Sequence, residues 1–500
     1  MKPLRPVVIL LLACGCSLAP HYARPATALP QTWKTAEGWS RAVPADQAPR
    51  GDWWTAFGDP QLDALMRQGD QHNQTVAQAA ATYAQARAAV REARASLFPV
   101  VSLDGSVTHT RSGSGRTIVS GGTVSGGGTT TTGTGTTTGT GTGSTTAVAT
   151  SGARSTTNYR VNIGATWEPD LFGAIRNSVS NAAATAEARG ADLASAQLAL
   201  HGELATDYLS LRGTDAQLAV LQATTDAYRR SLQIATNRYD AGIVARTNVF
   251  QAQSQLASAQ SDLEGLKRTR TQYEDAIAVL VGEPAASFRV AAVANWRPVV
   301  PDVPPVLPST LLQRRPDIAA AERAVAAANA AIGVERAAFF PDISLSADYG
   351  FNDNSIAKLF TSAASLWSVG AQVAQTLLDF GARRARVAQA RAAYDAAVAG
   401  YRGTVLTALQ DVQDNLVAQT ILARQETLLR TASEAADRSE ASIRDQYRAG
   451  IVVFTDVVTA QATALNARRA LVQAQLDRQT AAVALVQALG GGWTASPATR

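Results

Sequence analysis

Two halves of this 500-residue chain resemble each other. The matching segments are RASLFPVVSLDGSVT (from Arg94) with RAAFFPDISLSADYG (from Arg336), DLFGAIR (from Asp170) with LDFGARR (from Leu378), and RYDAGIVARTNVFQAQ (from Arg238) with QYRAGIVVFTDVVTAQ (from Gln446). A repeat with so long a period indicates that one architectural unit is built twice. A fold for this chain must therefore place equivalent elements in both halves.

A Gly/Thr-rich tract, Gly121–Gly143, interrupts only the first half. Phe98 and Phe340 are 242 residues apart, whereas Gly173 and Gly381 are 208 apart, so the first half carries 34 extra residues between Phe98 and Gly173. A tract of this composition has too few apolar side chains to form a packed core. We therefore predict a lengthened loop inside one structural unit, and not a linker between domains.

Four segments beside the repeat landmarks alternate apolar and polar residues. Their apolar residues are Val101, Leu103 and Val107; Tyr159, Val161, Ile163, Ala165 and Trp167; Ile343, Leu345, Ala347, Tyr349 and Phe351; and Trp367, Val369, Ala371 and Val373. This pattern predicts two β-hairpins, 99–168 with a loop at 111–155 and 341–376, each apolar on one face. Strands of about ten residues with this alternation are typical of transmembrane barrels. Four strands cannot close a barrel, so several copies of the chain must contribute.

Long proline-free stretches separate the predicted hairpins. No proline occurs between Pro169 and Pro284, or between Pro341 and Pro497. A continuous helix of roughly 65 residues, about 100 Å long, is expected in each half. A glycine follows each long helix and predicts a sharp helix–helix turn.

The N-terminus, MKPLRPVVILLLACGCSLAP, has the pattern of a secretory signal. Cys14 and Cys16 are the only cysteines, and a disulfide between positions i and i+2 is sterically poor. Lipidation of a cysteine at the cleavage point is the natural alternative, and the local pattern leaves both cysteines open. An ordinary signal peptide with an incidental cysteine is the other interpretation.

The expected organisation is a signal peptide over 1–15 and a lipid-anchored periplasmic segment over 16–60. The two structural repeats follow at 61–284 and 311–493, joined by a Pro-rich connector at 285–310, and a tail covers 494–500.

Several function classes are not supported by the sequence. The net charge is +5 without a dense basic tract, which argues against nucleic acid. The four histidines are scattered without the spacing of a metal site, and the Gly/Thr tract is not followed by the Lys-Ser/Thr of a phosphate loop. We therefore expect no enzyme. A trimeric surface adhesin would confine its strands to one terminus, whereas here both halves have them.

The chain resembles the outer-membrane factor lipoproteins of tripartite efflux systems, the TolC-like channels of the NodT branch. The resemblance covers essentially the whole chain and is carried by CSLAPHYARP after the signal, WWTAFGDPQLDAL (from Trp53), LLQRRPDIAAAERAVAAANAAIGVERAAFFP (from Leu311), DLFGAIR, and the ALGGGW ending. In that family the cysteine before SLxPxYxRP is lipidated. The resemblance thus implies an N-acyl and diacylglycerol lipid on Cys16 and no other cofactor.

The resemblance implies an α+β membrane protein that assembles as a homotrimer. Three chains would form a twelve-stranded β-barrel in the outer membrane of a Gram-negative bacterium, continued by a long α-helical barrel in the periplasm. The channel would conduct passively, and its partners would be a periplasmic adaptor (membrane fusion protein) and an inner-membrane resistance–nodulation–division (RND) pump. A channel serving an ABC-type protein secretion system is the alternative.

The resemblance also implies a gate at the helix turns. Asp456 matches an acidic constriction position, while Thr459 stands where relatives commonly carry a second acid. Asp456 could instead only support the start of the helix. Tyr447 resembles a gate-bracing tyrosine that hydrogen-bonds across to the first half, where Asn248 is its expected partner. The tip surface that meets the adaptor would comprise Gly242, Ile243, Gly450 and Ile451.

Overall fold

The computed structural model describes residues 18–26, 51–112, 116–118, 148–150, 154–293, 296–301 and 315–491. The chain divides into two compact units. The strand unit comprises Ala95–Leu171 and Phe339–Leu378; the helical unit comprises Met1–Arg94, Phe172–Ala338 and Asp379–Arg500. The signal peptide, Cys14 and Cys16, the Gly/Thr-rich tract, much of the Pro-rich connector and the 494–500 tail lie outside the described residues.

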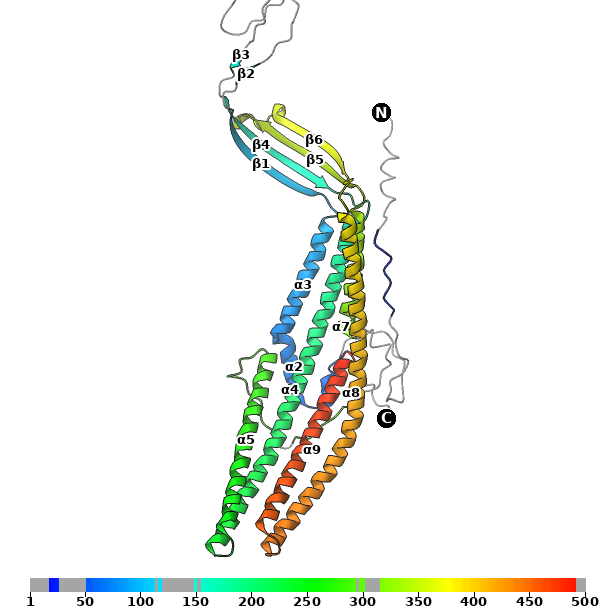
Figure 1. Ribbon diagram of the computed structural model, residues 1–500. Coiled ribbons are helices and arrows are strands. Elements are labelled where there is room, and N and C mark those ends of the chain that lie inside the picture. Colours follow the sequence, from blue (N-terminus) through cyan, green and yellow to red (C-terminus); the bar gives the residue numbers. More distant parts are fainter. Residues whose placement is uncertain are drawn as a thin grey trace, which may run out of the picture. The chain divides into compact units, whose positions relative to one another are not determined.

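The strand unit contains an antiparallel sheet of four long strands in the order β1-β4-β5-β6 (Figure 1). These strands are β1 (Val100–Ser112), β4 (Arg154–Trp167), β5 (Asp342–Asp353) and β6 (Ser365–Ala374). Two short 3-10 turns, η2 (Ile356–Lys358) and η3 (Ser362–Ala364), connect β5 to β6. A second pair, β2 (Arg116–Ile118) with β3 (Val148–Thr150), falls within the segment expected to be only a loop.

The strand register places the predicted apolar residues on one face. Leu103 lies opposite Ile163, and Ile163 lies opposite Tyr349 on the next strand. Tyr349 in turn lies opposite Trp367, so one apolar row crosses all four strands. Side chains opposite one another in an antiparallel pair point to the same side of the sheet. The exposed fractions of Leu103 and Trp367, 75% each, show that this face is uncovered in the single chain.

The helices of the two halves have identical lengths, which confirms the internal duplication. Helices α4 (Ala174–Asp240) and α8 (Ala382–Arg448) each have 67 residues. Helices α5 (Arg246–Leu280) and α9 (Phe454–Ala488) each have 35, and α3 (Gln74–Ala95) and α7 (Pro316–Ala337) each have 22. The structure has no helix, among the residues it describes, that is apolar enough over sufficient length to cross a membrane.

The repeated motifs DLFGAIR and LDFGARR mark the starts of the two longest helices. Gly173 and Gly381 are their N-caps, with φ of +79° and +97°. Glycine suits these positions because residues with a Cβ are strained in the left-handed region. In the second motif the Asp379 carboxylate accepts hydrogen bonds from the side chain and backbone of Arg383 and from the backbone of Gly381. These bonds lower the Asp379 pKa to about 2.

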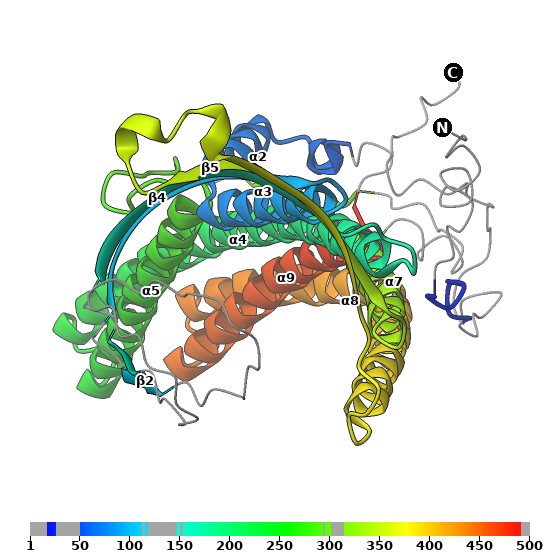
Figure 2. The ribbon, with the colours of Figure 1, turned by 90° about the horizontal axis from the view of Figure 1, so that it is seen from above.

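The helical unit places α5, α4, α9 and α8 side by side in this order (Figure 1). Seen from above, the α4–α5 hairpin and the α8–α9 hairpin are separate pairs that meet where α4 packs on α9 (Figure 2). Helix α7 packs against both α4 and α8. The core also includes Trp53, Trp54 and Phe57 of η1 (Trp53–Phe57) and residues of α2 (Pro60–His72), so part of the expected N-terminal segment packs into this unit.

Candidate gate and docking tips

The turn between α4 and α5 is closed by a glycine in the left-handed conformation. Gly242 has φ +74°, its N–H donates to the Tyr239 carbonyl (2.8 Å), and the Ile243 N–H donates to the Arg238 carbonyl (2.8 Å). These two bonds form a Schellman motif, which satisfies the last carbonyls of the helix. The α8–α9 turn repeats it 208 residues later: Gly450 (φ +79°) donates to Tyr447, and Ile451 donates to Gln446.

Both turns expose apolar side chains. Ile243 and Ile451 are 68% and 73% exposed, and Phe250 and Val453 are also largely exposed. Arg246 covers one side of the Phe250 ring at 5.2 Å from its centroid. The predicted tip residues thus form two equivalent exposed turns with uncovered apolar surface.

Tyr447 lies buried where the two hairpins meet near the tips. Its ring packs against Phe454, and the Arg238 guanidinium from α4 lies 4.5 Å from the ring centroid. Arg238 also donates a hydrogen bond to the Arg448 carbonyl (3.2 Å). The Tyr447 hydroxyl is buried and has no hydrogen-bond partner among the described residues, so the expected bond to Asn248 is not formed in this structure.

The link from Tyr447 to the first half is therefore a cation–π contact with Arg238. Such contacts contribute about 0.5–2 kcal/mol depending on how far the cation is desolvated. Sequence reasoning missed Arg238 because it sought an acceptor for the hydroxyl. Arg238 stands one residue before Tyr239, the repeat equivalent of Tyr447, so the duplicated motif held a clue.

Asp456 lies in the first turn of α9 and is exposed. A carboxylate at this place interacts favourably with the positive end of the helix dipole. Thr459 is also exposed, and its hydroxyl donates to the Thr455 carbonyl (2.9 Å). Asn248 holds the equivalent first-turn position in α5. Support of the helix start is thus compatible with the geometry, and a constriction formed by several copies is a separate proposal.

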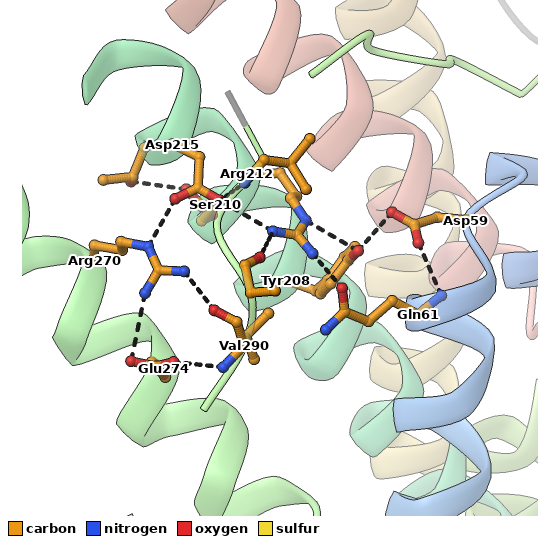
Figure 3. Close-up of polar contacts among 12 residues, drawn as sticks. Asp59, Gln61, Tyr208, Ser210, Arg212, Asp215, Arg270, Glu274 and Val290 are labelled. Atoms are coloured by element: carbon orange, nitrogen blue, oxygen red, sulfur yellow. Dashed lines mark hydrogen bonds and ion pairs between the residues drawn. The ribbon is translucent and has the colours of Figure 1, made fainter. Parts of the chain in front are cut away.

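Sequence reasoning also missed a buried polar network centred on Arg212 of α4 (Figure 3). The Arg212 side chain is 2% exposed. It donates hydrogen bonds to Asp215 (3.0 Å), Tyr208 (3.0 Å), Gln61 (2.5 Å) and the Ala291 carbonyl (2.7 Å). The Tyr208 hydroxyl donates a hydrogen bond to Asp59 (2.5 Å). Burial of the hydroxyl, and to a smaller degree this hydrogen bond, raises the pKa of Tyr208.

The network continues through Asp215 to α5 and the segment after it (Figure 3). Arg270 of α5 pairs with Asp215 (2.7 Å) and donates to the Val290 carbonyl (2.6 Å). Glu274 accepts from the Val290 N–H (2.5 Å). Buried charges are tolerated when they are paired and hydrogen-bonded in this way. The network joins α2, α4, α5 and residues 290–293, and we assign it a structural role.

The segment that follows Cys16 in sequence runs along α7. Asn329 and Arg336 of α7 donate to the carbonyls of Pro20 (2.9 Å) and Leu18 (3.2 Å), and Tyr22 donates to the buried Glu322 carboxylate. Within the described ranges no group of three or more His, Cys, Asp or Glu side chains is placed to hold a metal ion.

The duplicated chain, its sheet of four long strands with one exposed apolar face, and its long paired helices are the architecture of outer-membrane channel proteins. The model of the outer membrane efflux protein family matches residues 65–283 and 307–491. The chain belongs to this family.

The chain is similar to characterised members along nearly its whole length. Outer membrane protein OprJ of Pseudomonas aeruginosa is 29% identical over 497 residues, covering 98% of this chain and 97% of OprJ. The toluene efflux pump outer membrane protein TtgI of Pseudomonas putida is 31% identical, covering 98% of each. The solved structure of the outer-membrane channel OprN superposes with a TM-score of 0.79 at 29% identity, covering 96% of this chain and all of that one.

Proposed function

We propose that this protein is the outer-membrane channel of a tripartite efflux pump, formed by three copies of the chain. The strand units would build one twelve-stranded barrel and the helical units one periplasmic tunnel. A lipid on Cys16 would anchor each chain. The channel would conduct its substrates passively, without catalysing a reaction.

Ring assembly is supported above all by the unequal surroundings of α3 and α7. These helices are equivalent in the sequence repeat and equal in length, and α7 packs against α4 and α8 of the same chain. If the repeat continues around a ring, α3 must pack between α4 and the α8 of a neighbouring copy. Helix α3 has only one buried residue, Val76, so its surface is available for that neighbour.

The sheet supports the same arrangement. Strands β4 and β5 join the two halves within the chain, while β1 and β6 are edge strands. Pairing of β6 with β1 of the next copy would repeat the β4–β5 junction and remove both edges. Unpaired edges are not tolerated in lipid, and the exposed apolar face would contact the hydrocarbon.

Relatives are named for toluene efflux, antibiotic efflux and pyoverdine export. We propose that this channel likewise exports small organic molecules, delivered by a periplasmic adaptor and an RND pump. The exposed turns at Gly242–Ile243 and Gly450–Ile451 would contact the adaptor. Asp456 from three chains would form the constriction, with Tyr447 and Arg238 holding the two hairpins together.

Crosslinking in the native envelope, followed by purification and mass spectrometry, tests this proposal. We expect a homotrimer together with an adaptor and a proton-driven pump. Recovery of an ABC transporter would assign the channel to protein secretion. Absence of channel conductance after reconstitution in planar bilayers would contradict the channel itself and favour an adhesin.

A further inference from the structure

A cleft near the tips is lined by residues of α4, α8 and α9. Its volume is about 300 Å³, which is at the lower end for small-molecule sites. The cleft is lined by Ala227, Arg230, Ser231 and Ile234 of α4, Arg444, Tyr447 and Arg448 of α8, and Phe454, Val457 and Gln461 of α9. All of these residues belong to the helical unit.

The lining combines an apolar wall with a cationic rim. Ile234, Phe454 and Val457 provide the apolar wall, while three arginines and no acid belong to the lining. Guanidinium groups suit carboxylates because their fork of donors matches the two oxygens. A ligand that fits this lining carries an apolar body and one anionic group.

Several donors in the cleft lack a strong internal partner. Arg230 is exposed and forms no ion pair within the described part of the chain. Arg444 reaches Glu440 only at 3.4 Å, and its Nε atom is buried without a hydrogen-bond partner. Arg448 pairs with Asp445 (3.2 Å), where both side chains are at least 60% exposed and the attraction is weak.

The Tyr447 hydroxyl is the second, independent feature of the cleft. Tyr447 is 6% exposed, yet its buried hydroxyl has no partner among the described residues. A buried hydroxyl without a partner has a substantial free-energy cost, which an oxygen of a bound ligand would remove.

The α8 side of the cleft has no equivalent in the first half. The repeat equivalents of Arg444 and Arg448 are Thr236 and Asp240, and Tyr239, the equivalent of Tyr447, is 39% exposed. Arg230 is matched by Arg438 in the repeat, whereas Arg444 and Arg448 are not matched by arginines, so the cluster as a whole is not duplicated.

We propose that this cleft binds a small amphiphilic organic carboxylate. The carboxylate lies among Arg230, Arg444 and the Tyr447 hydroxyl, and the apolar body packs on Phe454 and Val457. A bound anion links α4 to α8, which belong to different hairpins, and therefore stabilises their packed arrangement. Binding is independent of the channel role; an effect on opening rests on the proposed function.

Calorimetric titration of the purified, assembled protein with sodium benzoate tests the proposal. We expect saturable binding of benzoate and at least tenfold weaker binding of benzamide, which has the same ring without the charge. Inorganic phosphate, which lacks the apolar body, should also bind more weakly. Equal binding of benzamide, or no saturable benzoate binding, would overturn the proposal.

Matched variants locate the site. Arg444→Gln and Arg230→Gln should each weaken benzoate binding by about tenfold, the effect of one charge-assisted hydrogen bond, and Tyr447→Phe should weaken it severalfold. Arg229→Gln removes the same charge next to Arg230 but outside the cleft, so it should bind normally. Unchanged affinity in both cleft arginine variants would contradict the site. Arg230 is exposed, so its variant decides the question even if Arg444→Gln fails to fold.

Bilayer recordings separate this proposal from the channel role. Benzoate should lower the open probability of the wild-type channel and have less effect on Arg444→Gln. If the protein binds benzoate but conducts no current, the ligand site stands and the channel proposal fails.

Discussion

Helices α3 and α7 have the same length and equivalent positions in the repeat, yet their burial differs. Ten residues of α7 are buried and only Val76 of α3 is. Both helices are rich in alanine, so composition does not explain the contrast. The difference is in their neighbours: α7 has α4 and α8 beside it in the same chain. This contrast supports the proposed assembly, in which other copies of the chain would cover α3.

The two hairpins show a second contrast. Arg270 of α5 and Arg478 of α9 are equivalent, and each pairs with the long helix of its own hairpin. Arg270 reaches the buried Asp215, whereas Arg478 reaches Glu426 at a place closer to solvent. Burial alone would raise the pKa of Glu426, but hydrogen bonds from Arg478 and Arg430 lower it below its ordinary value. In each hairpin an acid on the long helix thus pairs with the equivalent arginine, but Asp215 is more deeply buried than Glu426.

The largest effect is expected from a charge on the free face of α3. Ala77, Ala81, Ala84 and Ala88 form an exposed stripe at helical spacing, and the equivalent of Ala88 is the buried Ala330. Ala88→Glu should prevent assembly, because it would place an unpaired carboxylate in the interface. Size-exclusion chromatography with light scattering measures this. Thr82→Glu is the control and should assemble normally, since its equivalent Ala324 is exposed on α7. Normal assembly of Ala88→Glu would contradict the idea that a neighbouring copy covers this face of α3.

The buried network should show the next largest effect. Arg212→Ala leaves Asp215 buried with fewer partners and should cost about 3–5 kcal/mol, measured by urea unfolding of the helices with far-UV circular dichroism. Thr420→Ala, at the equivalent exposed position of α8, should change stability by less than about 0.5 kcal/mol. If Arg212→Ala and Thr420→Ala changed the stability equally, the buried network would not make α4 more sensitive than α8 at this position.

The two tip turns should respond alike to loss of their glycines. Gly242→Ala and Gly450→Ala should each cost about 1–2 kcal/mol, because alanine is strained at positive φ. Gly265→Ala, in the helix interior with open space around it, should instead stabilise by about 0.5–1 kcal/mol. Thermal unfolding provides the measurement. A large difference between the two turn variants would show that the tips are not equivalent.

The two halves should also differ in how their stability depends on pH, because Asp207 of α4 has no acidic equivalent in the second half. Burial, and to a lesser degree the charge of Glu203, raises the pKa of Asp207 to about 6. Its folded-state pKa exceeds the unfolded value, so its contribution to stability is present below about pH 4 and is lost as pH rises through about 6. The equivalent residue is Asn415.

Asp207→Asn should therefore stabilise the protein by about 1 kcal/mol above pH 6, less than the full shift implies because Asp207 is partly solvated. Below pH 4 the variant and the wild type should agree. Melting curves over this pH range measure the effect, and a pH-independent difference would contradict the assignment.

The smallest effect on stability is expected at the proposed gate. Asp456→Ala should cost only about 0.3–1 kcal/mol through the helix dipole. It should nevertheless raise single-channel conductance, because removing the charge of the proposed constriction would loosen the closed tip. Asn248→Ala, at the equivalent uncharged position, is the control. Unchanged conductance and ion selectivity in Asp456→Ala would remove Asp456 from the gate.

Local patterns predicted much of this fold. Strand alternation identified the apolar face that the register of Leu103, Ile163 and Tyr349 confirms. The repeat offset of 208 residues matches the equal helix lengths, and the turn glycines lie where the helices end. These features depend on residues near one another in sequence, so periodicity and glycine placement reveal them.

The sequence by itself determined the duplication, the four long strands, the extent of the two longest helices and the tip turns, because backbone preferences and side-chain periodicity act locally. Only the tertiary structure decided which polar groups meet across helices. Arg212 gained four partners from three elements, and Tyr447 met Arg238 instead of an acceptor for its hydroxyl. Helix rotation and spacing set such contacts, and these depend on the packing of the whole core.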